Sequence, residues 1–88
     1  MKVIIIDHAR ERMHERGATE DEVTAALSQG KPVEAPLGRK IKEMVFPFDA
    51  QWQGNSYEQK KVRVIYLEEN DNLAMITVYA YFGKWEEK

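Results

Sequence analysis

The spacing of hydrophobic residues changes once along the chain, near Pro32. Before this residue, apolar side chains recur every three or four positions, as on one face of a helix. After it, apolar residues alternate with polar or smaller ones, which is the pattern of a half-buried strand. The chain therefore predicts a helical first part and a sheet-forming second part, and its 88 residues suit a single domain over residues 1–88.

The first predicted helix covers about residues 8–16. Asp7 is a good N-cap because its carboxylate can accept hydrogen bonds from the free amides of the first turn, and Gly17 is a typical C-terminal stop. The β-branched run before it, residues 2–6, is either a short strand or an extended lead into the helix. We therefore expect the helix to begin directly after Asp7.

The second predicted helix covers about residues 20–29. Thr19 and Glu22 have the spacing of a capping box, and Gly30 follows the last helical residue. An apolar stripe with helical spacing runs along this segment and is formed by Val23, Ala26 and Leu27. This stripe is the part of the helix that we expect to face the core.

Three strands are predicted after the helices, around residues 44–48, 62–66 and 74–80. Residues 69–72 are expected to join the last two strands in a tight hairpin, because Asn and Asp tolerate left-handed backbone. Residues 49–57 are expected to form a looser connection. The predicted fold class is α+β, with two N-terminal helices packed on a three- to four-stranded antiparallel sheet.

The register of the last hairpin predicts which side chains share a face. A two-residue turn at Asn70–Asp71 places Arg63 beside Val78, on the face toward the helices, and Tyr79 beside Val64 on the other face. Both faces carry apolar residues, so helices on one face leave the other partly exposed. Either a partner or a second copy of the chain covers that face, or aromatic side chains fold back over it, namely Trp52, Phe82 and Trp85.

Composition limits the classes of chemistry and location. The chain has no cysteine, which excludes disulfides, thiolate nucleophiles and zinc–thiolate sites. Its net charge of −2 argues against nonspecific coating of nucleic acid, so any anion site must be local. No stretch approaches the roughly 20 apolar residues of a membrane helix, and residues 1–6 are too short for a signal peptide, so we expect a cytoplasmic protein without a membrane partner.

Basic and titratable residues are concentrated on the first helix. His8, Arg12 and Arg16 fall on one stripe, which borders the apolar line of Ala9 and Met13. Such residues are held by packing yet remain reachable, as catalytic groups must be, and the positive end of the helix favours a neutral His8 that could act as a base. The alternative is a solvated face with weak ion pairs, in which His8 only caps or packs.

Metal binding is not expected from this sequence. His8 and His14 are six residues apart and lie on different sides of the helix, because His14 falls on a second stripe with Arg10. No other histidine and no cysteine is present to complete a metal site. We therefore expect neither a metal nor another cofactor.

Further candidate site residues lie in the sheet-forming part. Arg63 is in the middle of an alternating strand, where it either pairs with Glu11 or Glu15 of the first helix or binds phosphate through its planar fork. Lys42 belongs to a basic entry to the sheet. Several aromatic side chains could stack on nucleic-acid bases or could simply pack, and these are Trp52, Tyr57, Tyr79 and Tyr81.

The order of residues in the first part carries a family resemblance. Residues 8–23 fit the motif H-x-x-x-R-M-x-x-R-G-[IA]-T-x-x-[ED]-V, and strands 62–66 and 76–79 follow it. The chain thereby resembles the bacterial domain-of-unknown-function family 4258. That family looks like a distant branch of the RelE and BrnT type toxins and related endoribonucleases, which share a helix-first, antiparallel-sheet core and need no metal.

The resemblance implies a small metal-independent endoribonuclease of toxin–antitoxin type, with RNA as substrate and a small antitoxin protein as partner. In this hypothesis His8, or else Tyr79, removes the 2′-hydroxyl proton, and Arg12 with Arg63 stabilises the charge on phosphorus. The expected RNA contacts are Arg16, Lys42, Tyr81, Trp52 and Tyr57. Two departures from the pattern stand out: Ala18 replaces a branched residue, and the pI near 5.7 is acidic, whereas toxins that grip the ribosome tend to be basic.

Two other functions fit the same residues. The first is a non-catalytic module that binds a protein or forms a homodimer through the apolar sheet face. The second is a small anion-binding or nucleotide-binding domain, in which Arg12 and Arg63 hold the anion without cutting anything.

Overall fold

The computed structural model describes residues 2–35 and 39–85. Five strands and two helices follow one another in the order β1 (Lys2–Ile5), α1 (Asp7–Arg16), α2 (Glu20–Gln29), β2 (Lys31–Val33), β3 (Lys40–Trp52), β4 (Asn55–Glu69) and β5 (Asn72–Gly83). The strands form one sheet in the order β1-β5-β4-β3-β2. The α+β class with two N-terminal helices is confirmed.

The sheet differs from the prediction in size and direction. It has five strands rather than three or four, and β1 runs parallel to β5, whereas all other neighbours are antiparallel. The β-branched run at the start of the chain is therefore a strand that pairs with the last one in the sequence. β2 was missed because three residues are too few to show alternation.

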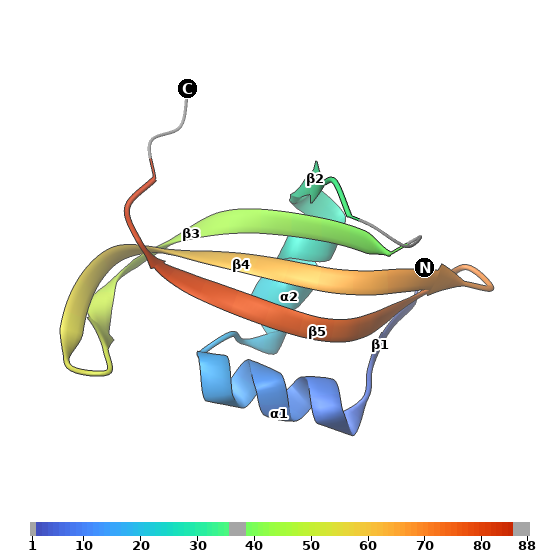
Figure 1. Ribbon diagram of the computed structural model, residues 1–88, viewed down its shortest axis with the longest axis horizontal. Coiled ribbons are helices and arrows are strands. Elements are labelled where there is room, and N and C mark those ends of the chain that lie inside the picture. Colours follow the sequence, from blue (N-terminus) through green and yellow to red (C-terminus); the bar gives the residue numbers. More distant parts are fainter. Residues whose placement is uncertain (1, 36–38, 86–88) are drawn as a thin grey trace.

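The helices cover one face of the sheet (Figure 1). Seen from the open face, α2 lies behind β3 and β4, and α1 lies along β5. The core fills the space between helices and sheet, and its fully buried side chains are Ala9, Val23, Ala26, Val62, Val64 and Val78. The predicted apolar lines of both helices are confirmed as the buried ones. No helix among the described residues is long and apolar enough to cross a membrane.

The capping of α1 corrects one prediction. Its N-cap is Ile6 in extended backbone (ψ 160°), with no side-chain cap, and Asp7 is the first helical residue. The chain leaves β1 extended and enters the helix one residue earlier than predicted, so the Asp7 carboxylate lies in the first turn, where the helix dipole favours it. Gly17 ends α1 in left-handed backbone (φ 76°), as predicted.

The capping box of α2 is confirmed in both directions. The backbone amide of Glu22 donates to Thr19 Oγ1 (3.2 Å), and the amide of Thr19 donates to Glu22 Oε1 (2.9 Å). The helix ends at Gly30, which is in extended backbone. These two bonds fix the direction in which α2 leaves the α1–α2 junction.

Both long hairpins turn tightly. At the β4–β5 turn, Asn70 and Asp71 both have positive φ (48° and 66°), as a two-residue turn of the predicted kind requires. The β3–β4 connection is also tight, because Gln53 and Gly54 turn the chain directly between paired residues of the two strands. The prediction of a loose connection over residues 49–57 was wrong: the pairing is irregular only beside Asp49, which also has positive φ.

The predicted register of β4 and β5 was half right. The pairing begins at the turn as expected, but it shifts between Ile65 and Tyr66, where β5 holds one extra residue. A bulge of this kind exchanges the two faces beyond it. Arg63 therefore lies opposite Tyr79 on the open face of the sheet and does not point toward the helices.

The aromatic side chains that were expected to cover the open face divide between the two faces. Trp52 and Phe82 stack on each other (ring centroids 5.1 Å apart), and Trp52 lies against Gly17 at the end of α1, on the helix face. Of the three, only Trp85 contacts a side chain of the open face, Lys61. The open face therefore keeps most of its area uncovered among the described residues.

Candidate functional site

One end of the open face carries three aromatic rings, and each ring lies beside one basic side chain. We call this set the aromatic–basic surface. Its three pairs, with the distance from cation to ring centroid, are Arg16 on Tyr79 (4.4 Å), Arg63 on Tyr81 (5.5 Å) and Lys61 on Trp85 (4.7 Å). The two tyrosine rings are 6.5 Å apart and nearly parallel, and they are 37% and 42% exposed. Alternation along β5 and the bulge before it together place these rings on one face.

Arg16 belongs to the surface although it comes from a helix. It is the last residue of α1, and its Nη1 donates to the carbonyl of Val78 (2.7 Å) and to Oγ1 of Thr77 (3.4 Å). The carbonyl is available because β1 pairs with β5 only as far as Met75, so no strand of residues 2–35 or 39–85 pairs with the outer edge of β5 beyond that residue. The edge bond holds the guanidinium against the ring of Tyr79.

Arg63 is held by a carboxylate on the neighbouring strand. Its Nε and Nη2 both donate to Glu43 Oε2 (3.1 and 2.9 Å), and the two residues are direct cross-strand partners. The expected partners Glu11 and Glu15 were wrong, because they lie on the exposed side of α1. The pair is partly exposed, and its two bonds leave Nη1 of Arg63 for another acceptor.

The local charge differs in sign from that of the whole chain. The aromatic–basic surface has three cations, and Glu43 is the carboxylate paired with one of them. The chain as a whole has a net charge of −2. This surface therefore has the local positive charge that an anion site in an acidic protein needs.

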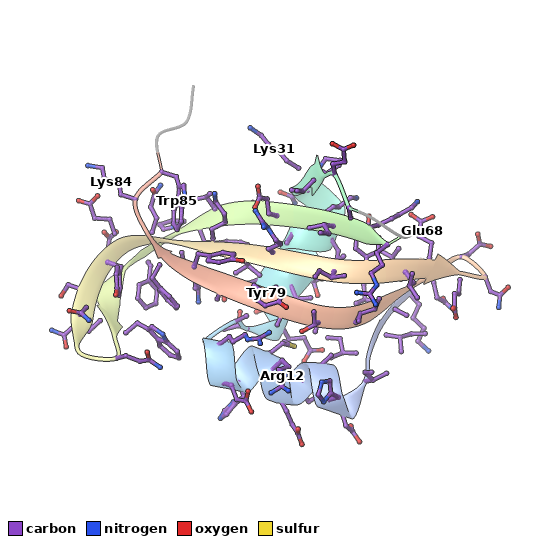
Figure 2. All side chains as sticks on the ribbon, viewed as in Figure 1. Arg12, Lys31, Glu68, Tyr79, Lys84 and Trp85 are labelled. Carbon is purple, nitrogen blue, oxygen red and sulfur yellow. The ribbon has the colours of Figure 1, made fainter. Side chains whose placement is uncertain are left out.

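The predicted catalytic residues of α1 do not join this surface through any contact among the described residues. His8 is exposed near the start of α1, and Arg12 donates to Glu15 (2.8 Å). Figure 2 shows Arg12 on α1 and Tyr79 on the neighbouring β5. Within the predicted set, the structure thus brings together Arg63 and Tyr79 and leaves His8 and Arg12 on the helix.

A family model identifies the chain at the level of its domain. The model, described as Domain of unknown function (DUF4258), matches residues 5–80. The chain belongs to this family. A search of curated proteins and a search of solved structures found no match.

The matched range of the DUF4258 domain runs from the end of β1 almost to the end of β5. It includes Arg16, Arg63 and Tyr79, whereas Tyr81 and Trp85 follow it. The resemblance drawn from the motif over residues 8–23 is confirmed for the family. The likeness of that family to RelE and BrnT toxins stays a prediction.

Three of the predicted RNA contacts lie on the opposite face of the DUF4258 domain. Lys42 Nζ donates to the carbonyl of Leu27 (2.9 Å) and so binds the end of α2 to the sheet. Trp52 and Tyr57 both pack against Phe82. These three residues make packing or hydrogen-bond contacts on the helix face. Of the predicted RNA contacts, only Tyr81 and Arg16 lie on the open face.

Sequence reasoning missed Lys61 and Glu43 as site residues, and it considered Trp85 only as a side chain that could cover the open face. The alternation of Val62 and Val64 with their neighbours already placed Lys61 on the face of Arg63, so this residue was within reach of the pattern. Glu43 and Trp85 depend on the pairing of distant segments, which no local pattern shows. Among the described residues, no group of three or more histidine or acidic side chains could hold a metal ion.

Proposed function

We propose that the protein binds single-stranded RNA on the aromatic–basic surface and cleaves it there, as a cytoplasmic endoribonuclease of toxin–antitoxin type. The observation that carries this proposal is the set of three rings on one sheet face, each beside a cation; Tyr79 and Tyr81 are exposed, and Trp85 is partly buried. Rings offer a stacking platform for bases, and cations offer a path for phosphates. Sheet faces of this composition bind two or three unstacked bases in other RNA-binding domains.

A single strand fits this surface better than a duplex. In a duplex the faces of the bases are stacked on one another, so the rings of Tyr79 and Tyr81 could not reach them. Stacking contributes about 1–3 kcal/mol for each base and tolerates any sequence. The affinity for single-stranded RNA should therefore be modest and should fall with salt, with little preference among the bases.

The chemistry that these residues could support is attack by the ribose 2′-hydroxyl on the adjacent phosphorus. The hydroxyl oxygen of Tyr79 accepts the 2′ proton and passes its own proton to water; the 2′ oxygen forms a bond to phosphorus, and the bond from phosphorus to the 5′ oxygen breaks. Arg16 and Arg63 flank this position and would offset the charge that builds on the phosphate oxygens. The leaving 5′ oxygen takes a proton from water, and the products are a 2′,3′-cyclic phosphate and a 5′-hydroxyl.

The binding half is tested with a fluorescently labelled RNA oligonucleotide and fluorescence anisotropy. Arg63→Ala and Tyr81→Ala should each weaken binding about 5- to 100-fold, as loss of one stacking or phosphate contact implies. Lys31→Ala is the matched control, because Lys31 is an exposed lysine of β2, far from Tyr79 in Figure 2. An equal loss in the control would show that only overall charge matters, and it would overturn the assignment of this surface.

The cleavage half is tested with the same RNA and with a copy whose riboses carry 2′-O-methyl groups. Tyr79→Phe should keep most of the binding and lose cleavage, and the methylated RNA should bind without being cut. Mass spectrometry of the products should find the cyclic phosphate. Binding without any cut by the wild-type protein would reduce the function to RNA binding, and cutting of the methylated RNA would exclude the 2′-hydroxyl route.

A specific observation also favours a second function, binding of a protein partner. The other end of the open face is an apolar stripe across four strands, formed by Ile4, Ala74, Leu67, Ile65 and Ile41. A small antitoxin or a second copy of the chain could bury this stripe. Light scattering over a range of concentrations tests the second copy: Ile65→Lys should abolish any dimer, and a monomer at every concentration would exclude it.

A further inference from the structure

The helix face contains a cavity of about 420 Å³ between α2 and the sheet, on the opposite side from the aromatic–basic surface. One part of its wall is apolar and comes from three elements: Val3 of β1, Leu27 of α2 and Leu73 of β5. A cavity of this size is within the range of small-molecule sites. It differs from the proposed RNA surface in residues, face and shape.

The remaining wall presents polar groups that converge on the same space. Tyr66 is only 4% exposed, and its hydroxyl makes no hydrogen bond to another described residue. Lys42 also lines the cavity, and its Nζ donates one of its three protons to the carbonyl of Leu27 (2.9 Å), its one hydrogen bond to a described residue. Ser28 also lines the cavity at the end of α2, and its hydroxyl donates to the carbonyl of Ala25 (3.3 Å).

A second hollow of about 410 Å³ lies next to the first and shares three lining residues with it, Tyr66, Lys42 and Glu68. It is lined on its far side by Lys40 and Arg39. Glu68 forms an ion pair with Lys40 (3.0 Å), so this end keeps an excess of positive charge after the pairing. The two hollows together run from an apolar end at β1 to a basic end at the start of β3.

We propose that this cavity binds a small amphipathic anion. Its apolar chain would lie against Val3, Leu27 and Leu73, and its carboxylate or phosphate would accept hydrogen bonds from Tyr66 and Lys42. Such a ligand gives the Tyr66 hydroxyl an acceptor inside the cavity and matches the change from apolar to basic residues along its wall. A neutral or cationic ligand of the same length would leave the basic end without a partner.

The state of Tyr66 agrees with this role. Burial raises the pKa of Tyr66, and the nearby carboxylate of Glu68 raises it further, against an opposing effect of Lys40. The side chain therefore remains a neutral phenol at physiological pH and offers a hydrogen-bond donor to an anion. A phenolate at the same place would repel it.

The experiment uses octanoate as the probe and octanol as a control with the same chain and no charge. Titration of the full chain is followed by NMR of the methyl groups of Val3, Leu27 and Leu73. Octanoate should shift these signals in a saturable way, and octanol should bind several-fold more weakly. Tyr66→Phe should weaken octanoate about 2- to 10-fold, the effect of one lost hydrogen bond, and Tyr57→Phe should leave it unchanged.

Three results would overturn the proposal. Methyl shifts spread over the whole molecule would indicate unspecific binding of a detergent-like chain. Equal binding of octanoate and octanol would remove the anion from the ligand class. Equal effects of Tyr66→Phe and Tyr57→Phe would show that the cavity is not the site. If the site is confirmed, the same titration with octyl phosphate shows whether it prefers a carboxylate or a phosphate.

Discussion

Lys60 and Arg63 are three residues apart on β4, and they face opposite sides of the sheet. Lys60 is 5% exposed: its Nζ donates to the carbonyl of Gly17 (2.8 Å) and forms an ion pair with Glu22 (2.8 Å). Arg63 is about one-third exposed and is held by Glu43. Both cations have a carboxylate partner, yet only Arg63 keeps a donor that an outside ligand could reach.

The difference shows how one strand serves two purposes. Lys60 bonds to the end of α1 and to the capping box of α2, so it fixes the junction of the two helices onto the sheet. The same pleat turns Lys61 and Arg63 to the open face, where the helices do not reach. Stability and ligand binding should therefore respond to different residues of β4, and this separation can be tested.

The largest effect is expected from Lys60→Met. Methionine keeps an apolar chain of similar length but removes the cation from the carboxylate of Glu22, which keeps only the amide of Thr19, and removes the donor to the carbonyl of Gly17. Loss of one member of a buried ion pair costs about 3–5 kcal/mol, a large part of the total stability of a small domain. Urea denaturation followed by circular dichroism measures the change.

Lys61→Met is the matched control for this experiment. It makes the same substitution one residue later on the opposite face, where the cation lies over Trp85 and makes no ion pair among the described residues. Its free energy of unfolding should change by about 0.5 kcal/mol or less. If Lys61→Met destabilises the protein as much as Lys60→Met does, stability does not depend more on the helix face of β4 than on its open face.

The next effect concerns the junction that Lys60 holds. Gly17 has φ of +76°, and a Cβ atom at this position would lie 2.8 Å from the ring of Trp52. Gly17→Ala should therefore cost roughly 1–3 kcal/mol from backbone strain and overpacking together. Thermal and urea denaturation measure this loss.

Gly54→Ala separates the two causes. Gly54 also has positive φ (+84°), but a Cβ atom there would meet nothing within 4 Å. Its cost should be only the backbone term, about 1 kcal/mol. Equal losses at the two glycines would mean that Trp52 moves aside freely and does not lock the junction.

The sequence predicted those parts of the molecule that depend on near neighbours. The two helices, their glycine ends, the capping box and the Asn70–Asp71 turn all follow from interactions within a few residues, and each was found. The parallel pairing of β1 with β5 could not be predicted, since it joins residues about 70 positions apart. Short-range patterns contain no information on such a pair.

The candidate site was predicted only in part for the same reason. Residue type alone named Arg63, Tyr79, Tyr81 and Arg16 as candidates, but it did not group them on one surface. A single extra residue in β5 reversed the expected face of Arg63 and brought it beside the tyrosines. The role of Lys60 was missed, because a lysine near the start of a strand looks like an ordinary exposed residue. Only the assembled structure places the α1–α2 junction over it. Burial, which decides between these roles, is a property of the assembled fold.

A smaller effect should appear at the open face when Glu43 is changed. Glu43→Gln removes the carboxylate that pairs with Arg63 of the aromatic–basic surface, so RNA affinity should rise about 2- to 5-fold at low salt. Stability should fall by about 1 kcal/mol or less, because the pair is partly exposed. Glu11→Gln on the outer side of α1 makes the same charge change elsewhere, and an equal gain there would mean that only net charge matters.

The smallest effect concerns the pH dependence of the helix face. The pKa of Tyr66 is raised above its ordinary value of 10.0 by burial, so in this range the folded protein binds more protons than the unfolded chain. Stability from this group is therefore complete below about pH 10 and is lost as the pH rises toward and through the folded pKa. Tyr66→Phe has no such proton to lose, and its free energy of unfolding should fall less than that of the wild type between pH 8 and pH 11. Urea denaturation at pH 8 and at pH 11 measures the loss of unfolding free energy in each protein, and Tyr57→Phe is the control. If the wild type and Tyr66→Phe lose stability in parallel, burial on the helix face does not raise the pKa of Tyr66.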